Sequence, residues 1–487
     1  MGWFLLGAVA FLVFELTVLR AGVVLTRPLW LDEVHTYLLA STQPLSESMR
    51  SLGSGADFNP PTIFLLYRIV GHLAGGLSEL TMRLVALACV VGALATIYVL
   101  LREQFPRAAA AVGALSVWTH PVVVYAAFDA RFYGPWLLAT GCMLVAVRRA
   151  VADRPSALSN AALAIAAAAL CTVHYFGILS WAAAVVPLLL VAPGRRGATI
   201  RRLLPALAGP LLLAACIPLF LEQRAALTVP TWNRPQSIVG LLHLLAALLL
   251  QPATVVALAF WGGTRLLKAH VRITFTTPQR AGLALGPQLL LAQVAVPVVL
   301  AVFSLAVQPV THPRYWIVGA FVGAPLVAAG VLQSGRGLGA IIAAVTLACS
   351  VLTLDVQRAS AARQAQRANA DMESVARLAD TGALVITRQR HTLYPLLVQR
   401  PDLQSKVALL DLSAIDPNDD EAVIERDVAR VHLSRFGFPK LVTPNELATV
   451  QSFYFVELSP TRSPTASEFP YHTIQPVSPR LFLLKRR

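Results

Sequence analysis

The stretch Trp30-Leu31-Asp32-Glu33-Val34-His35-Thr36-Tyr37 follows the first long apolar segment of the chain, residues 3–25. Two neighbouring acids at the edge of a membrane are costly unless water or a function stabilises their charges. The meaning of this stretch therefore depends on two questions: whether the rest of the chain is a membrane protein, and on which side of the membrane Asp32 and Glu33 lie.

The composition is that of an integral membrane protein. Of the 487 residues, 56% are hydrophobic and 13% are charged, whereas soluble domains carry about 25% charged residues. Many apolar runs reach the roughly 20 residues that a helix needs to cross a bilayer. We expect eleven spans: residues 3–25, 82–101, 108–127, 133–149, 158–173, 176–192, 203–222, 238–262, 284–307, 315–333 and 338–354. The first segment lacks a clear cleavage site, so it is expected to be a retained helix rather than a signal peptide.

The formal net charge of +15 does not indicate binding to nucleic acid. Residues 1–354 carry 23 Lys/Arg against 10 Asp/Glu, whereas residues 355–487 carry 17 against 15. The excess therefore lies in the membrane part, where short basic loops set the orientation. All five cysteines fall in apolar runs, so we expect neither a disulfide framework nor a cysteine metal site.

The charges of alternate loops predict the orientation. One set of loops carries 14 Lys/Arg against two acids, Glu103 and Asp153, and the positive-inside rule places this set in the cytoplasm. The run 61–77 is apolar but short, and every basic loop falls on one side only if it does not span. We therefore predict a long first external loop, residues 27–81, in which 61–77 is a juxtamembrane or re-entrant helix. The C-terminus is then external.

Residues 355–487 differ from the rest and predict a small α/β domain on the external face, beside a membrane domain of residues 1–354. The expected strands and helices follow from apolar runs and from helix-capping signals. The strands are residues 382–387, 406–412, 452–458 and 480–486, and the helices include 356–380 and 416–437. The sequence of this domain contains no glycine-rich phosphate-binding loop.

The predicted external loops carry chemically capable side chains at helix ends, which the basic loops lack. These are Asp32, Glu33, His35, Tyr37, Asp57 and Asn59 in the first loop, Asp129, Arg131 and Tyr133 in the second, His174 and Tyr175 in the third, and His312, Arg314 and Tyr315 in the fifth. Taken singly, each has an ordinary explanation as a solvated acid, a snorkelling arginine or an interface aromatic. Four such clusters on one side of the membrane favour a functional site.

The residue types in these clusters fit one chemical task. A carboxylate in a partly dry site can remove a proton from a hydroxyl or an amine. Two arginines, Arg131 and Arg314, can hold a phosphate bidentately and stabilise it as it leaves. A long loop with an apolar helix can guide a lipid tail along the membrane.

Five motifs in this order resemble the GT-C superfamily of glycosyltransferases over roughly residues 1–330. They are Asp32-Glu33, Asn59-Pro60-Pro61, Asp129-Ala130-Arg131-Phe132-Tyr133, His174-Tyr175-Phe176-Gly177 and Pro313-Arg314-Tyr315. The likeness is greatest to the dolichyl-phosphate-mannose protein mannosyltransferases and to bacterial relatives that act on lipid A or cell-envelope glycans. Two positions depart from the pattern, because many relatives have histidine at the place of Asn59 and glutamate at the place of Asp129. The C-terminal domain shows no recognisable likeness.

The resemblance implies an inverting hexosyl- or pentosyltransferase that moves a sugar from a polyprenyl-phosphate donor to a glycan, lipid or protein. Asp32 is then the general base, and Glu33 and Asp129 help to bind the acceptor or a divalent cation, a metal requirement that the sequence leaves open. The expected substrate-binding residues are Arg131, Tyr133 and Arg314 at the donor phosphate, with His35, Asn59, His174, Tyr175 and Tyr315. The implied location is a bacterial inner membrane, with the active site and the C-terminal domain on the extracytoplasmic face.

Three other functions fit part of the pattern. A transporter or lipid flippase places ionisable residues near the bilayer midplane, often within inverted repeats, and no repeat is visible in this sequence. A non-catalytic envelope assembly protein would use the C-terminal domain to bind a partner. An O-antigen ligase or polymerase usually has its large external loop late in the chain, whereas this chain has it first.

Overall fold

The structure is a computed structural model and describes most of the chain. The described residues are 22–25, 27–152, 156–191, 196–226, 237–249, 254–255, 284–307, 309–310, 312–333, 335–416, 420–457 and 463–487. Of the predicted span 3–25, only the last four residues, 22–25, are described. Of the predicted span 238–262, the described residues are 238–249 and 254–255.

The chain divides into two compact units. The first, called here the membrane unit, contains Met1–Leu25, Leu80–Ile217 and Asn233–Ser360. The second, called the sheet unit, contains Thr26–Glu79, Pro218–Trp232 and Ala361–Arg487. In this division most of the first external loop, residues 27–81, and the segment Pro218–Trp232 group with the C-terminal residues rather than with the rest of residues 1–354.

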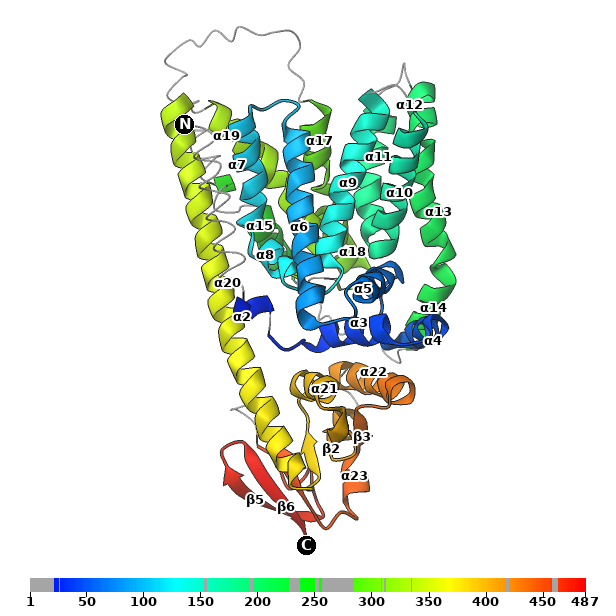
Figure 1. Ribbon diagram of the computed structural model, residues 1–487, viewed down its shortest axis with the longest axis vertical. Helices are drawn as coiled ribbons and strands as arrows, with labels where there is room; N and C mark the ends of the chain where they lie inside the picture. The colour runs from blue at the N-terminus through cyan, green and yellow to red at the C-terminus, as the bar shows by residue number, and fades with distance from the viewer. Residues whose placement is uncertain are drawn as a thin grey trace. The chain divides into compact units, whose positions relative to one another are not determined.

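The membrane unit is helical throughout its described residues (Figure 1). Its elements are α2 (Gly22–Leu25), α6 (Glu79–Leu101), α7 (Arg107–Trp118), α8 (Pro121–Ala127), α9 (Tyr133–Ala152), α10 (Ala157–Val173), α11 (Gly177–Val191), α12 (Arg196–Leu203), η4 (Leu204–Leu207), α13 (Ala208–Ala215), α15 (Ile238–Leu249), α17 (Leu285–Ala292), α18 (Ala295–Ala306), η5 (Pro313–Val322), α19 (Gly323–Gln333) and the first part of α20 (Gly335–Asp380). Among the described residues, six segments are long and apolar enough to cross a membrane, or seven if α7 and α8, bent by 80°, form one span. Three more predicted spans coincide with the shorter apolar helices α10, α11 and α15. The protein is therefore an integral membrane protein.

The sheet unit combines the first loop with a six-stranded sheet. Its helices are α3 (Leu31–Ser41), α4 (Leu45–Ser51), η2 (Leu52–Ala56), α5 (Thr62–Leu73), most of α14 (Ile217–Ala225), α21 (Arg390–Gln399), η6 (Pro401–Leu403), η7 (Leu412–Ala414), α22 (Asp420–Phe436) and α23 (Pro444–Leu447). Its strands are β1 (Val385–Thr387), β2 (Val407–Leu410), β3 (Lys440–Val442), β4 (Ser452–Val456), β5 (His472–Ser478) and β6 (Leu481–Arg486), in the order β3-β2-β1-β4-β6-β5. Strands β3, β2, β1 and β4 are parallel to one another, and β6 is antiparallel to both of its neighbours, β4 and β5.

The sequence predicted four of these six strands and missed β3 and β5. Strand β3 has only three residues, and β5 is an exposed edge strand that contains Pro476, a residue that sheets tolerate at their edges. The expected helix 356–380 is not separate, because α20 continues from the last span for 46 residues without a break (Figure 1). Phe453, Phe455 and Phe469 are fully buried in the core of the sheet.

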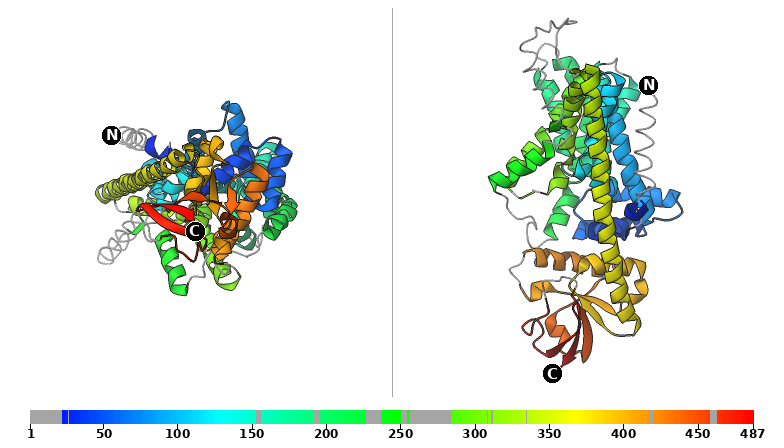
Figure 2. Two further views of the ribbon diagram at one scale, coloured as in Figure 1. Left: turned by 90° about the horizontal axis from the view of Figure 1, so that it is seen from below. Right: turned by 90° about the vertical axis from the view of Figure 1, so that its left-hand side faces the viewer.

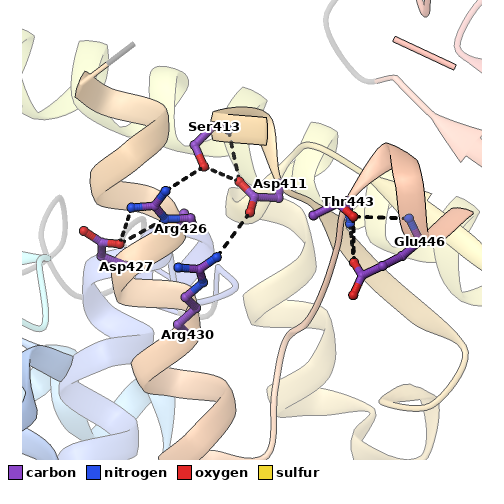
Figure 3. A network of polar contacts seen from close by, with 7 residues as sticks. All are labelled: Asp411, Ser413, Arg426, Asp427, Arg430, Thr443 and Glu446. Carbon is purple, nitrogen blue, oxygen red and sulfur yellow. Dashed lines mark hydrogen bonds and ion pairs between the residues drawn. The ribbon is translucent and has the colours of Figure 1, made fainter. Parts of the chain in front are cut away.

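A polar network holds α22 against the carboxyl end of β2 (Figure 3). Asp411, which follows β2, accepts hydrogen bonds from the backbone N–H (3.0 Å) and the hydroxyl (2.6 Å) of Ser413. Arg426 on α22 donates to the same hydroxyl at 3.3 Å, and Arg430, one turn later, lies 4.0 Å from the Asp411 carboxylate. Thr443 and Glu446 form a separate capping box at the start of α23.

Within the sheet unit, α21 and α22 lie between the sheet and the first loop (Figures 1 and 2). Helix α3 packs against α21, and η2 packs against α22. Arg435 donates to the Ser54 hydroxyl at 2.8 Å and lies 3.4 Å from the Glu47 carboxylate. The C-terminal residues and the first loop are therefore one folded body.

Candidate functional site

The membrane unit brings the predicted second, third and fifth external loops together around one histidine. His174, at the end of α10, stacks on Phe132 with ring centroids 4.0 Å apart and lies parallel to the ring of Tyr315 at 5.9 Å. The Arg314 guanidinium lies 5.7 Å from the ring centre of Tyr133. Phe132 and Tyr315 are 183 positions apart in sequence, so the cluster is a product of the fold.

The cluster is buried and rich in charge. Asp129 is fully buried, and Arg131 is only 7% exposed. The charges of Arg314, Asp129 and Arg131 all act on the Tyr133 hydroxyl. Arg131 and Arg314 also act on His174. Arg131 and Arg314 carry two positive charges against the single negative charge of Asp129, and an anion such as a phosphate would balance the difference.

Local packing explains why these loops take their positions. Gly134 follows Tyr133 on α9, and a Cβ there would lie 2.8 Å from the backbone oxygen of Ala86 on α6. A Cβ at Gly177 would lie 1.9 Å from the Leu170 backbone oxygen, so the turn after His174 requires glycine. The Nδ1 atom of His174 accepts a hydrogen bond from the backbone N–H of Phe176 at 3.2 Å. A neutral His174 therefore carries its proton on Nε2, which is a donor.

The acids of the first loop belong to the sheet unit and differ from each other. Glu33 is fully buried, accepts a hydrogen bond from the Trp30 backbone N–H at 3.1 Å and lies 3.5 Å from the Arg27 guanidinium. These contacts satisfy an N–H at the start of α3. Asp32 is half-buried in the first turn of the same helix. Glu33 thus anchors the turn that presents Asp32. The catalytic role expected of Glu33 stays a prediction.

The side chain of Asn59 is used within the first loop. Its amide N–H donates to the Asp57 carboxylate at 2.6 Å, and its backbone oxygen accepts from the Gln223 side chain at 3.0 Å. Both Asp57 and Asn59 are buried. The expected contacts of Asn59 and of half-buried Tyr175 with a substrate stay predictions.

Sequence reasoning missed three residues of the C-terminal part that lie near the first loop, two of them in contact with His35. The ring of His35 lies 4.5 Å from that of His432 and 5.8 Å from that of Tyr394, and His391 lies one turn before Tyr394 on α21. His432 Nε2 donates to the Ala56 backbone oxygen at 3.1 Å. Burial lowers the pKa of His432 to about 4, so its ring is neutral at pH 7. No sequence motif marks these residues.

The described residues contain no group of three His, Cys, Asp or Glu side chains arranged to hold a metal ion. Glu33, one of the expected ligands, is engaged by Arg27 and the Trp30 backbone. The donor set in the described part of the chain therefore does not fit a resident divalent cation, and no step of the reaction is assigned to one.

Comparison with known proteins extends the resemblance seen in the motifs. The sequence profile of the dolichyl-phosphate-mannose-protein mannosyltransferase family matches residues 59–221, about a third of the chain. No curated protein sequence matches the chain. Among solved structures, ArnT from Cupriavidus metallidurans bound to undecaprenyl phosphate matches with a TM-score of 0.60 and 15% identity, over 98% of this chain and 98% of that chain. The apo state of the same ArnT matches with a TM-score of 0.60 and 16% identity, over 99% of this chain and 97% of that chain.

The likeness to ArnT covers both units, including the C-terminal residues that showed no recognisable likeness in sequence. The predicted fold, an all-α membrane domain with a small C-terminal α/β domain, is confirmed. The chain therefore has the GT-C fold that its motifs predict.

Proposed function

We propose that the protein is an inverting glycosyltransferase that moves a hexose or pentose from a polyprenyl-phosphate donor to an acceptor outside the cytoplasm. The observation that carries this proposal is the cluster of Arg131, Arg314, Tyr133 and His174 in the membrane unit, where a buried and a half-buried arginine lie among aromatic rings. The solved ArnT structure that shares this fold binds undecaprenyl phosphate, which supports a polyprenyl-phosphate ligand here.

The proposed reaction is one in-line displacement. Asp32 removes the proton from a hydroxyl or amine of the acceptor as that atom attacks the anomeric carbon of the sugar. The bond between the anomeric carbon and the phosphate oxygen breaks, and polyprenyl phosphate leaves with the electron pair. Arg131 and Arg314 hold the phosphate as its charge grows, which lowers the barrier because their dipoles and charges are already in place. No covalent intermediate with the protein forms.

The proposed location is a bacterial inner membrane, with the residues of the site on the extracytoplasmic side. Loop charge supports this orientation, because Arg102, Arg148 and Arg202 fall in the loops predicted to be cytoplasmic. Helix α5 has 12 residues, a length of roughly 18 Å, which is short for the roughly 30 Å hydrocarbon core. We therefore expect the variants Ser46→Cys and Ser78→Cys, both at exposed positions, to react with a thiol reagent added from outside. Labelling of only one of them would mean that α5 spans.

The function is tested by sugar transfer from a panel of polyprenyl-phosphate monosaccharides, with the purified full-length protein in lipid nanodiscs. Wild type is compared with Asp32→Asn, and Glu47→Gln serves as a control carboxylate on the neighbouring helix α4. We expect one donor to turn over, Asp32→Asn to lose turnover by about 10³-fold and Glu47→Gln to match wild type. If no donor turns over, or if Asp32→Asn is as active as wild type, the proposal is wrong.

A further inference from the structure

Helices α3 and α21 of the sheet unit place two polar residues side by side. The ring of His35 on α3 meets the ring of Tyr394 on α21 edge to face, with centroids 5.8 Å apart. Asp32 lies three residues before His35, and His391 lies three residues before Tyr394. Residues three apart share one face of a helix, so Asp32 and His391 lie on the faces through which α3 and α21 contact each other. The charge of Asp32 indeed acts on the His391 ring.

The two pairs differ in exposure. Tyr394 is 2% exposed, and His432, which lies behind it, is fully buried. Asp32 is half-buried and His391 is exposed. The aromatic pair therefore fixes the two helices to each other, whereas the Asp32–His391 pair is accessible to another molecule.

The contact between the first loop and the C-terminal helices is well anchored. His432 and Arg435 on α22 bond to Ala56 and Ser54 of the first loop. The opposite face of α22 is fixed to the sheet by Arg426 and Arg430 (Figure 3). The position of His391 beside Asp32 is thus set by the fold of the whole sheet unit.

The surroundings of His391 favour the neutral form of its ring. Neighbouring protein atoms and the Arg390 guanidinium lower the pKa of His391 below its ordinary value of 6.5, while Asp32 opposes them. A neutral imidazole has one donor and one acceptor nitrogen. It can therefore exchange hydrogen bonds with a hydroxyl group without competing for the proton that Asp32 removes.

We propose that His391 binds the acceptor next to Asp32 and so helps to select a hydroxyl-bearing acceptor. This inference rests on the proposed function, because it takes Asp32 to be the base. One hydroxyl of the acceptor faces Asp32 and loses its proton, and a neighbouring hydroxyl forms a hydrogen bond with His391. The C-terminal α/β domain then contributes directly to acceptor recognition.

The first test measures binding without turnover. The full-length protein in nanodiscs is treated with diethylpyrocarbonate, and labelling of His391 is followed by mass spectrometry in the Asp32→Asn background. Octyl β-glucoside, below its micellar concentration, is the probe for a hydroxyl-bearing acceptor, and undecaprenyl phosphate is the probe for the donor carrier. We expect octyl glucoside to slow labelling of His391 about fivefold and undecaprenyl phosphate to leave it unchanged. Exposed His72 on α5 is the internal control, and equal labelling of His391 with and without octyl glucoside overturns the inference.

The second test measures transfer to octyl glucoside. We expect His391→Ala to raise the KM for this acceptor about tenfold and to leave the KM for the donor unchanged, with partial recovery in His391→Gln, whose amide can still form hydrogen bonds. The control is Gln399→Ala at the far end of α21. If Asp32→Asn abolishes transfer while His391→Ala keeps the wild-type acceptor KM, the inference fails and the proposed function stands. If wild type transfers no sugar, the proposed function fails, and the labelling result alone decides whether His391 binds an acceptor.

Discussion

The residues proposed to hold the donor and those proposed to meet the acceptor lie in different units and differ in their surroundings. In the membrane unit, Arg131 and Tyr133 are almost completely buried among aromatic rings. In the sheet unit, Asp32 is half-buried at the first turn of a helix that rests on the C-terminal domain. Burial strengthens electrostatic attraction, which suits a site that holds one constant group, the phosphate. An accessible carboxylate suits a site where acceptors enter and leave.

The largest expected effect separates these two roles. Replacing Arg314 by alanine should lower turnover by about 10³-fold and weaken donor binding, because a preformed cation for the leaving phosphate is lost. Asp32→Asn should lower turnover to a similar extent while donor binding is unchanged. Turnover is measured with the donor found in the panel, and binding is measured by calorimetry with undecaprenyl phosphate. If Asp32→Asn weakens this binding as much as Arg314→Ala does, the division of roles between the units is wrong.

The sequence predicted the membrane-unit half better than the sheet-unit half. Asp129, His174 and Arg314 lie at helix ends that loop charge predicted to share one side of the membrane, so we expected them to meet, and the structure brings their loops together. His391 and His432 lie more than 350 residues after Asp32, on amphipathic helices with no motif. Their proximity depends on the packing of α21 and α22 on the first loop, and no local pattern encodes that packing.

The neighbouring acids Asp32 and Glu33 show a second limit of sequence reasoning. The pair looks like a single catalytic motif, in which the resemblance makes Asp32 the base and gives Glu33 a part in binding the acceptor or a cation. The structure distinguishes them through the contacts of Glu33 with Arg27 and the Trp30 backbone. Such contacts depend on the path of the chain just before α3, where Trp30 is extended, and the residue types do not reveal them.

The next effect concerns the stability of the sheet unit. Arg388, which follows β1, is buried between the carboxylates of Glu457 and Glu468 and lies 2.9 Å from the latter. Arg388→Ala should destabilise the unit by about 3–5 kcal/mol, because two buried carboxylates lose their cation. Thermal unfolding in nanodiscs, followed by hydrogen exchange of β1 and β4, measures the change. The control Arg400→Ala removes an exposed arginine that pairs with Asp380 and Asp402 and should leave the unfolding midpoint unchanged.

We also expect Arg388→Ala to loosen the first loop, because that loop folds against α21 and α22. Hydrogen exchange at α3 should then rise together with exchange in the sheet, while the helices of the membrane unit stay protected. Unchanged exchange at α3 in a variant whose sheet has opened would contradict the conclusion that the first loop and the C-terminal residues are one body.

A smaller effect follows from the pKa of His432. Burial holds this pKa near 4 in the folded protein, against about 6.5 in the unfolded chain, and nearby Asp57 opposes the shift without cancelling it. The unfolded state therefore binds more protons between these values, so stability is fully present above pH 6.5 and is lost as the pH falls toward 4. At about 1.4 kcal/mol per pKa unit, the loss approaches roughly 3 kcal/mol. Hydrogen exchange of α22 between pH 7 and pH 4.5 measures it.

The matched variant is His432→Gln, whose amide can still donate to the Ala56 backbone oxygen. Its stability should depend less on pH over the same range, although His391, whose pKa is also lowered, keeps part of the slope. A slope as steep as that of wild type would show that His432 is not the group that titrates.

The smallest expected effect distinguishes the two acids of the first loop. Glu33→Gln keeps an oxygen that can accept from the Trp30 N–H but loses the charge that faces Arg27, so it should cost about 1 kcal/mol of stability. Because Asp32 stays in place, turnover should fall less than tenfold, and its pH profile should keep the wild-type shape. A catalytic carboxylate at this position would instead cost at least about 10²-fold in turnover. Steady-state turnover of Glu33→Gln and Asp32→Asn, measured side by side from pH 5 to pH 9, decides between these roles. Equal losses of turnover would make the two acids a joint catalytic group. A much larger loss in Asp32→Asn would leave Asp32 as the base and Glu33 as the residue that positions it.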